Sequence, residues 1–178
     1  KKIGAGPISI NLIHDIDLLR HLCGEVSSVQ AIITPSIRKY ENEDLASIVI
    51  HFKSGMTGNV SVSDSIVSPW SWEMNSKENS AFPYSGQNCY LLGGTKGSLS
   101  IPDLKMWSHQ QYPDWKTPLK NKILNFKPND PFKDQIKNFC NVIQEKEKPL
   151  VPGLEGLNSL KVLEAIQKSG ETKQIVNL

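Results

Sequence analysis

The stretch GPISINLIHDIDLLRHLCGE, residues 6–25, decides how the chain begins to fold. Its apolar residues recur at spacings of four, three and four, which places them in one stripe of an α-helix: Leu12, Ile16, Leu19 and Cys23. Gly24 follows directly and supplies the left-handed residue that commonly ends a helix. We therefore predict a helix from about Ser9 to Cys23 whose apolar stripe faces the core.

Three polar residues of the same helix, His14, Asp17 and His21, fall within about 60° of one another and nearly opposite the apolar stripe. They have three possible roles. They can form a solvated face with contacts one turn apart, or a metal site that needs further ligands from elsewhere. In the third, His14 is a general base and Asp17 holds or charges its ring. Spacing alone does not choose among them.

The segment GAGPIS has two of the glycines of a dinucleotide-binding G-x-G-x-x-G motif, Gly4 and Gly6. The third glycine position is Ser9, Pro7 stiffens the phosphate turn, and only residues 1–3 precede it where a strand is required. We interpret the segment as the lead-in to a helix, not as a cofactor-phosphate site.

The middle of the chain has the period of β-strands. We expect strands over residues 26–34, 46–52, around 60–62, 89–92, 98–101 and near Met106, with an irregular stretch at about 65–88 and a closing strand at 175–176. These elements predict an α+β fold in one domain, residues 1–178: an open, mostly antiparallel β-sheet with helices packed on one face.

Two further helices are expected near the C-terminus. Asp130 and Pro131 start the first, and its predicted buried face is Phe132, Ile136, Phe139 and Ile143, with Cys140 beside it as core packing. The second runs from about Gly153 to Ser169 and ends at Gly170, and we expect it to bury Leu157, Leu160, Leu163 and Ile166.

Composition excludes several classes of function. A net charge of +2 with scattered lysines is too weak for a nucleic-acid or membrane-surface partner, and no apolar run approaches the ~20 residues that span a bilayer. Three cysteines without a C-x-x-C pair argue against disulfides and structural zinc and favour the cytoplasm. Because the chain begins at Lys1 and enters a helix at once, we expect it to be part of a longer protein.

Several segments carry a resemblance to a known family. The start GAGPISINLIHDIDLLRHLCGE resembles the beginning of the C-terminal domain of the glucose-fructose oxidoreductase, inositol dehydrogenase and rhizopine-catabolism (Gfo/Idh/MocA) family. The likeness extends through SDSIVSPWSWE (63–73), CYLLGGTKGSLSIPDLKMW (89–107) and FKDQIKNFCNVIQEKEKPLVPGLEGLNSLKVLEAIQKSGET (132–172). Together these segments span nearly the whole chain.

The resemblance implies a two-domain oxidoreductase that uses NAD or NADP to oxidise or reduce a sugar-like or cyclitol hydroxyl or carbonyl. The cofactor would be bound mainly by an N-terminal Rossmann domain that is absent here, so this part alone is expected to bind no cofactor or metal and to be inactive. His14 takes the family's acid/base position, where a lysine of the other domain normally assists it. Family members commonly associate through the sheet, which implies a homo-oligomer.

Two positions depart from the family pattern. Many members have an aspartate four residues before the histidine and a glycine two before it, where this chain has Ile10 and Leu12. Without that aspartate, Asn11 becomes a candidate for a substrate hydrogen bond and Asp17 for orienting the ring.

Outside the helix, Asp64 is a further candidate ligand for substrate hydroxyls. Trp70 and Trp72 either stack on the substrate or merely pack over the sheet edge. His51 and His109 are expected to be structural or exposed.

Two rival functions remain: a non-catalytic module that dimerises through its sheet, and a free-standing carbohydrate-binding protein. A ligand response at Trp70, Trp72 or His14 favours the enzyme over the dimerisation module. A Rossmann motif upstream of Lys1 would exclude the free-standing protein.

Overall fold

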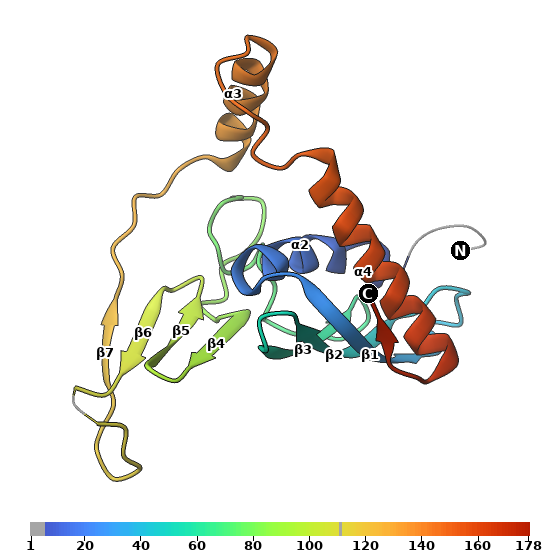
Figure 1. The fold of residues 1–178 in the computed structure, drawn as a ribbon, viewed down its shortest axis with the longest axis horizontal. Helices are drawn as coiled ribbons and strands as arrows, with labels where there is room; N and C mark the ends of the chain where they lie inside the picture. The colour runs from blue at the N-terminus through green and yellow to red at the C-terminus, as the bar shows by residue number, and fades with distance from the viewer. Residues whose placement is uncertain (1–5, 111) are drawn as a thin grey trace. The chain divides into compact units, whose positions relative to one another are not determined.

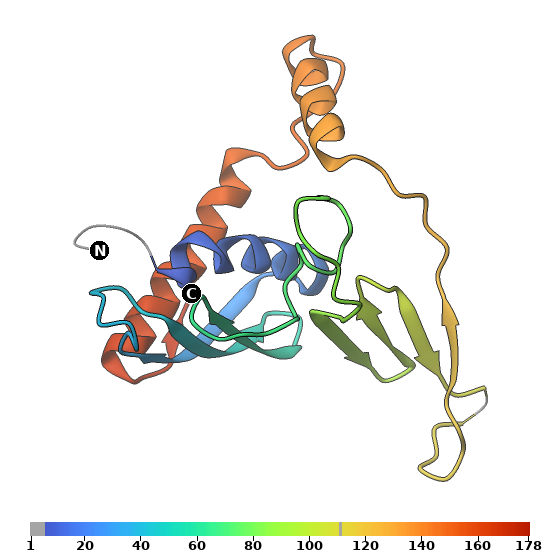
Figure 2. The ribbon, with the colours of Figure 1, turned by 180° about the vertical axis from the view of Figure 1, so that it is seen from behind.

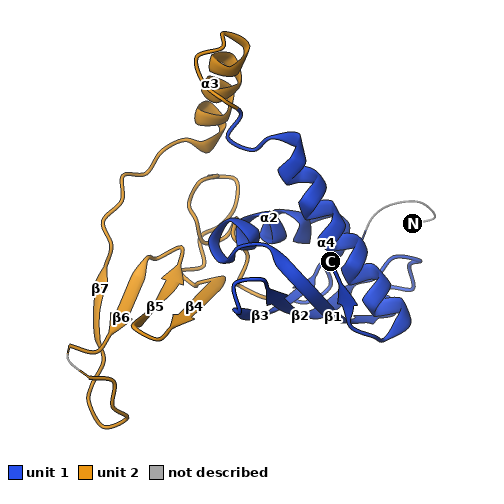
Figure 3. Cartoon of the chain, in the orientation of Figure 1, with its two compact units in different colours: residues 1–66, 149–178 blue, residues 67–148 orange. Residues whose placement is uncertain are grey.

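The computed structural model describes residues 6–110 and 112–178. Gly4 of the glycine pair considered above lies outside this range. The chain forms two compact units, residues 1–66 with 149–178 and residues 67–148 (Figure 3). The first unit contains α1 (Pro7–Ile10), α2 (Leu12–Cys23), β1 (Val26–Thr34), β2 (Leu45–Phe52), β3 (Thr57–Ser63), α4 (Gly153–Thr172) and β8 (Val176–Asn177). The second contains β4 (Tyr90–Gly94), β5 (Gly97–Ile101), β6 (Lys105–Ser108), β7 (Lys120–Ile123) and α3 (Pro131–Ile143).

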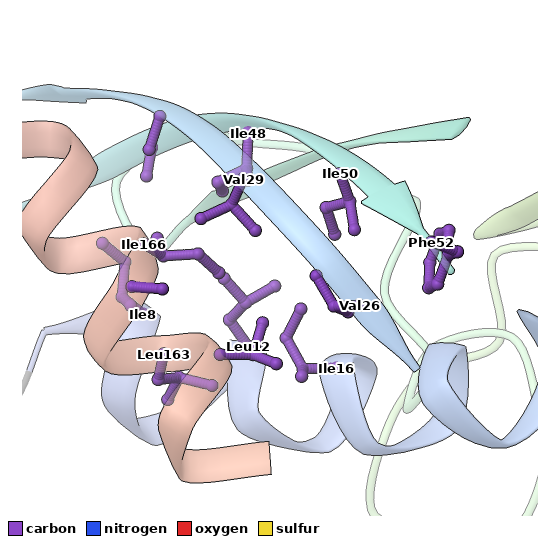
Figure 4. Close-up of a cluster of buried hydrophobic side chains, with 14 of the residues drawn as sticks. Ile8, Leu12, Ile16, Val26, Val29, Ile48, Ile50, Phe52, Leu163 and Ile166 are labelled. Carbon is purple, nitrogen blue, oxygen red and sulfur yellow. The ribbon is translucent and has the colours of Figure 1, made fainter. Parts of the chain in front are cut away.

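The sheet of the first unit has the strand order β3-β2-β1-β8, with every pair antiparallel. Alternate residues of β2 are buried, as the period of two requires: Ala46, Ile48, Ile50 and Phe52. Helices α2 and α4 lie against this buried face (Figure 1), and the apolar side chains of helices and strands point toward one another (Figure 4). The predicted stripe of α2 is confirmed, since Leu12, Ile16 and Cys23 are buried and Leu19 packs against them.

The N-terminal helix begins earlier than predicted and is interrupted. Pro7 occupies the first turn of α1, whose last turn ends at Asn11, and α2 begins at the next residue. The Glu43 carboxylate lies against Gly6, where a Cβ atom would be 2.2 Å from its carboxyl carbon, so a larger residue would displace this carboxylate. That carboxylate accepts a hydrogen bond from the Ile8 N–H at 3.0 Å. The glycine therefore makes room for a helix cap.

The prediction that α4 ends at Gly170 is wrong. The helix continues to Thr172 and ends where Lys173 adopts the left-handed conformation. Gly170 instead allows α4 to approach β1, since a Cβ on it would lie 2.2 Å from Ile33 Cδ1. The predicted burial is confirmed only for Leu163 and Ile166, while two other members of the stripe are about half exposed, Leu157 and Leu160.

The second unit has an antiparallel sheet in the order β4-β5-β6-β7. The stretch predicted to be irregular has no helix or strand and forms a loop before β4 (green in Figure 2). Strand β7 was not predicted, because its sequence KNKI lacks apolar alternation and all four residues are exposed on an edge strand.

Helix α3 starts as predicted, with the Asp130 side chain accepting hydrogen bonds from the Phe132 and Lys133 N–H groups. Its predicted buried face is wrong, because the four residues are 62–66% exposed: Phe132, Ile136, Phe139 and Ile143. Cys140 is also exposed and is not core packing. Periodicity identified the apolar side of this helix but not whether anything covers it.

The α+β class with antiparallel strands is confirmed, although the strands form two sheets and not one. In the part of the chain that the structure describes, no helix is long and apolar enough to cross a membrane.

Candidate functional site

His14 lies on the exposed side of α2, opposite the residues that the helix buries against the sheet. Its backbone N–H donates to the Asn11 carbonyl at 3.1 Å where α2 begins. Its imidazole makes no hydrogen bond or ion pair with the other described residues. The ring is therefore accessible from solvent, and both of its nitrogens are open to a ligand.

Asp17, one turn after His14, is bound to α4. Its Oδ1 accepts a hydrogen bond from Ser159 Oγ at 3.0 Å and lies 3.9 Å from Arg20 Nη1. No hydrogen bond joins it to His14 among the described residues. Its side chain is 42% exposed, and the hydrogen bonds shown engage only Oδ1. The carboxylate is thus anchored on one side and open on the other.

Arg20 forms the buried polar contact that joins α2 to α4. Its side chain is 2% exposed, and Nη2 contacts Glu25 Oε1 at 2.6 Å and Glu155 Oε2 at 2.8 Å. Nη1 donates to the Glu155 carbonyl and to Ser159 Oγ, each at 2.9 Å. Burial acts to lower the pKa of Arg20, but hydrogen bonds with the two glutamates outweigh it and the pKa is raised. This charge network holds the helix that carries His14.

Two further polar residues lie at the start and near the end of α2. Asn11 and His21 are both exposed. No group of three or more His, Cys, Asp or Glu side chains in the described residues is arranged to hold a metal ion. The metal interpretation of the His14, Asp17 and His21 face therefore gains no support from the structure.

Asp64 lies directly after β3, where its carboxylate pairs with Arg38. Arg38 also pairs with Asp44, which is 1% exposed and accepts a hydrogen bond from Ser36 Oγ at 2.8 Å. The hydrogen bonds from Arg38, above all, hold the pKa of Asp44 well below its ordinary value despite burial. Asp64 is about one-third exposed, so its carboxylate is partly engaged and partly accessible.

Trp70 and Trp72 belong to the second unit, in the loop before β4. Trp70 is 61% exposed. The Trp72 indole N–H donates to Glu78 Oε2 at 2.8 Å, and its ring lies tilted against Tyr90 with centroids 6.0 Å apart. The Trp72 ring is therefore fixed by its indole N–H and by Tyr90, whereas most of Trp70 is accessible to solvent.

The structure thus places His14 and Asp17 on α2 and Asn11 at its N-cap, with Asp64 directly after a strand in the same unit. Two other residues of this region were missed by the sequence analysis, Arg20 and Arg38. Arg20 follows Leu12 and Ile16 at four-residue intervals. A charged residue on the apolar side of the helix was therefore the sequence signal for a buried charge. No comparable signal marks Arg38.

The entrance to α1 does not fit a dinucleotide phosphate. The helix has only four residues, and the Glu43 carboxylate already accepts the Ile8 N–H group. An anionic phosphate would meet that carboxylate, so these residues are unsuited to hold one.

Sequence comparison identifies one matching family over the entire chain. The family described as "Oxidoreductase family, C-terminal alpha/beta domain" matches residues 1–178. No curated protein matches the chain significantly.

Solved structures with the same fold share little sequence with it. An NAD-binding protein from Listeria innocua is 20% identical with a TM-score of 0.70. The WlbA dehydrogenase from Bordetella pertussis, in complex with NADH and UDP-GlcNAcA, is 23% identical with a TM-score of 0.62. An aldose-aldose oxidoreductase from Caulobacter crescentus, complexed with glycerol, is 21% identical with a TM-score of 0.65. These matches cover 97%, 98% and 93% of this chain but only 47%, 45% and 45% of those chains.

Proposed function

Because this chain belongs to that oxidoreductase family as its C-terminal alpha/beta domain, we propose that it is the substrate-binding half of an NAD(P)-dependent oxidoreductase. The reaction is the oxidation or reduction of a sugar-like or cyclitol hydroxyl or carbonyl. His14 is the acid/base in this proposal.

The observation that carries the proposal is that the His14 imidazole is accessible, while the opposite side of α2 is packed against the core. Oxidation of a secondary alcohol releases a hydride to the nicotinamide and a proton to a base. Imidazole accepts a proton near neutral pH better than any other side chain. The buried stripe and the Arg20 network immobilise α2, so the ring is presented from a rigid element, as proton transfer requires.

Neighbouring polar groups supply the contacts that would orient a polyol. The Asn11 side chain is exposed one turn before His14, and Asp17 Oδ2 is open one turn after it. In this proposal Asn11 and Asp17 bind hydroxyl groups on either side of the reacting carbon. Asp64 contributes less, because Arg38 already occupies part of its carboxylate.

Trp70 and Trp72, in the second unit, are proposed as residues that can stack on the apolar face of a sugar ring. Aromatic faces suit the C–H side of a sugar, and Trp70 leaves most of its ring accessible. The WlbA structure contains a sugar nucleotide and the Caulobacter oxidoreductase structure contains glycerol, which supports this substrate class for a protein with the same fold.

The cofactor is proposed to bind mainly outside this chain. The residues of this chain at the α1 entrance do not fit a phosphate, and the chain spans less than half of the Listeria NAD-binding protein and of the WlbA dehydrogenase. In this proposal NAD or NADP is held by an N-terminal domain, and this chain alone does not turn over.

The decisive experiment replaces His14 in the full-length oxidoreductase. We expect His14→Ala to lower kcat by ~10²-fold or more while the circular dichroism spectrum stays unchanged. His21→Ala is the matched control, since His21 is exposed on the same helix, and it should retain activity. Assays follow NAD(P)H absorbance with D-glucose and myo-inositol as probes. An unchanged kcat for His14→Ala would remove His14 from the reaction.

The sheet of the first unit also supports association of two copies. Its face away from α2 and α4 carries, in two rows of paired residues, Gln30, Val49 and Asn59, and Ile32, Ser47 and Ser61. None of these six residues is charged, and Ile32 is 65% exposed and Val49 45%. Protein surfaces are usually rich in charged residues, which oppose association, so we propose that a second copy covers this face.

Sedimentation tests the association. Val49→Lys places a charge at the centre of the face and should shift a dimer to monomer. Ile37→Lys, at an exposed apolar residue in the loop after β1, is the control and should leave the dimer intact. If both variants and the wild type sediment as the same species, the sheet face is not the interface.

A further inference from the structure

The loop between β3 and β4 has no helix or strand, yet one of its polar side chains is almost completely buried. Asn75 is 4% exposed, although its neighbours in sequence reach solvent. A buried amide must satisfy two N–H donors and a carbonyl oxygen, or it destabilises the fold.

Asn75 satisfies all of these groups within the loop. Its Nδ2 donates to the Pro69 carbonyl at 2.7 Å and to the Ser71 carbonyl at 2.8 Å. Its Oδ1 accepts from the Gln87 N–H at 2.7 Å and lies 2.8 Å from Ser85 Oγ. The side chain therefore crosslinks the beginning of the loop, residues 69–71, to its end, residues 85–87.

Backbone and hydroxyl contacts also join the beginning of this loop to its end. The Ser85 N–H donates to the Met74 carbonyl at 2.9 Å, and Ser85 Oγ lies 2.7 Å from the Pro69 carbonyl. These contacts bring together residues more than ten positions apart without a strand or helix. We regard residues 69–87 as a closed loop with Asn75 at its centre.

The crosslink acts at the positions that carry the aromatic side chains. Trp70 lies between the two residues whose carbonyls accept from Asn75, and Tyr84 precedes Ser85. Both rings are more than half exposed. Lys77 Nζ lies 4.0 Å from the centroid of the Tyr84 ring, which further restricts that side chain.

We propose that Asn75 is a positioning residue that holds Trp70, Trp72 and Tyr84 as a preformed platform for the apolar face of a sugar or cyclitol ring. The proposal rests on the function proposed above. An irregular loop that had to become ordered on binding would spend part of the binding free energy on that ordering. A loop closed by an amide whose donors and acceptor all have partners avoids this loss. Its aromatic rings are then in place before the ligand arrives.

The chemistry of the crosslink makes asparagine specific. Asn75→Asp keeps the shape but brings a carboxylate against the carbonyl oxygens of Pro69 and Ser71, which it cannot bond. Asn75→Ala removes the partner of the Ser71 carbonyl and of the Gln87 N–H and leaves the Pro69 carbonyl with Ser85 Oγ alone. Both changes should loosen the loop. Asn79→Ala is the matched control, because among the described residues the Asn79 side chain accepts one hydrogen bond, from the nearby Ala81 N–H of the same loop at 2.9 Å.

Hydrogen exchange of the chain tests the crosslink without any ligand. In Asn75→Ala and Asn75→Asp, the hydrogen-bonded backbone amides of the loop, Asn75, Ser76, Ser85 and Gln87, should exchange at least tenfold faster than in the wild type, while β1 and β2 of the first unit exchange at unchanged rates. In Asn79→Ala the amides around Gln87 should stay protected. Unchanged exchange across 69–87 in both Asn75 variants would overturn the proposal.

Ligand binding separates a positioning role from a merely structural one. D-glucose and myo-inositol serve as probes, followed by the NMR shifts of the tryptophan indole N–H groups. Asn75→Ala should weaken the response of these groups about tenfold, and in the full-length enzyme it should raise KM while kcat changes little. A loosened loop with undiminished affinity would refute the positioning role. A wild-type chain that responds to neither probe would contradict the proposed substrate class, while the exchange comparison would still decide the role of Asn75.

Discussion

Ser159 on α4 donates a hydrogen bond to Asp17 on α2, with 3.0 Å between the hydroxyl and Oδ1. The same hydroxyl accepts a hydrogen bond from Arg20 at 2.9 Å. One small side chain thus joins the carboxylate next to His14 to the buried guanidinium behind it. The orientation of α2 is fixed by polar contacts as well as by its apolar stripe.

The hydrogen bond should appear as an energetic coupling. We expect Asp17→Ala and Ser159→Ala to be non-additive in the free energy of unfolding by about 1 kcal/mol, since a contact to a carboxylate that is partly exposed is worth less than a fully buried one. Urea unfolding of the two single variants and the double variant measures this. Asp17→Ala combined with Thr172→Ala, whose hydroxyl bonds Lys168 on the surface, should be additive. Strict additivity for the first pair would contradict the coupling.

Arg20→Met should destabilise the chain. It removes a buried cation that holds two glutamates and Ser159. Loss of one partner of a fully buried pair costs about 3–5 kcal/mol, but Glu25 and Glu155 are 51% and 44% exposed and can be hydrated. We therefore expect a loss of about 2 kcal/mol by urea unfolding. Lys161→Met, on the exposed side of α4, should change stability by less than about 0.5 kcal/mol, and equal effects of the two would argue against the network.

The sequence predicted the elements whose own pattern decides their structure. The bounds predicted for β1 match the observed ones, and the α2 stripe is buried, because in both cases the period of the residues matches the period of the element. Asp130 caps α3 as expected, since its carboxylate needs only the two N–H groups that follow it.

Features that depend on distant residues could not be predicted. Gly170 looked like a helix stop, but Ile33, far away in sequence, is what requires it. The buried charge of Arg20 needs Glu155 and Ser159 from α4. Asn75 has no periodic neighbours, and its role is visible only once the loop closes around it. The candidate site was predicted as a helix face, while the contacts that fix that face were not.

Asp44 should make stability depend on acidic pH. Its folded-state pKa is depressed, first of all by Arg38. Its stabilising contribution is therefore fully present above the unfolded pKa, about 3.9, and is lost as the pH falls through the lower folded value. Asp44→Asn should be less stable than the wild type at pH 7, and the difference should narrow below about pH 4. Urea unfolding across this range measures it. Arg38→Met should abolish the same pH-dependent difference, and a gap that stays constant with pH would contradict the assignment.

Gly170→Ala should destabilise the first unit although it improves helix propensity. A Cβ at this position would lie 2.2 Å from Ile33 Cδ1 and 2.5 Å from its Cγ1, so the Ile33 side chain must change conformation or α4 and β1 must move apart. Overpacking costs about 1–3 kcal/mol, which exceeds the ~1 kcal/mol that alanine gains over glycine in a helix. Gly156→Ala is the matched control in the same helix, because nothing lies within 4 Å of its Cβ position, and it should stabilise the chain. Thermal unfolding compares them. In an Ile33→Ala background the obstructing atoms are gone, so Gly170→Ala should become neutral or stabilising. If Gly170→Ala is equally harmful there, close approach to Ile33 is not the reason for the glycine.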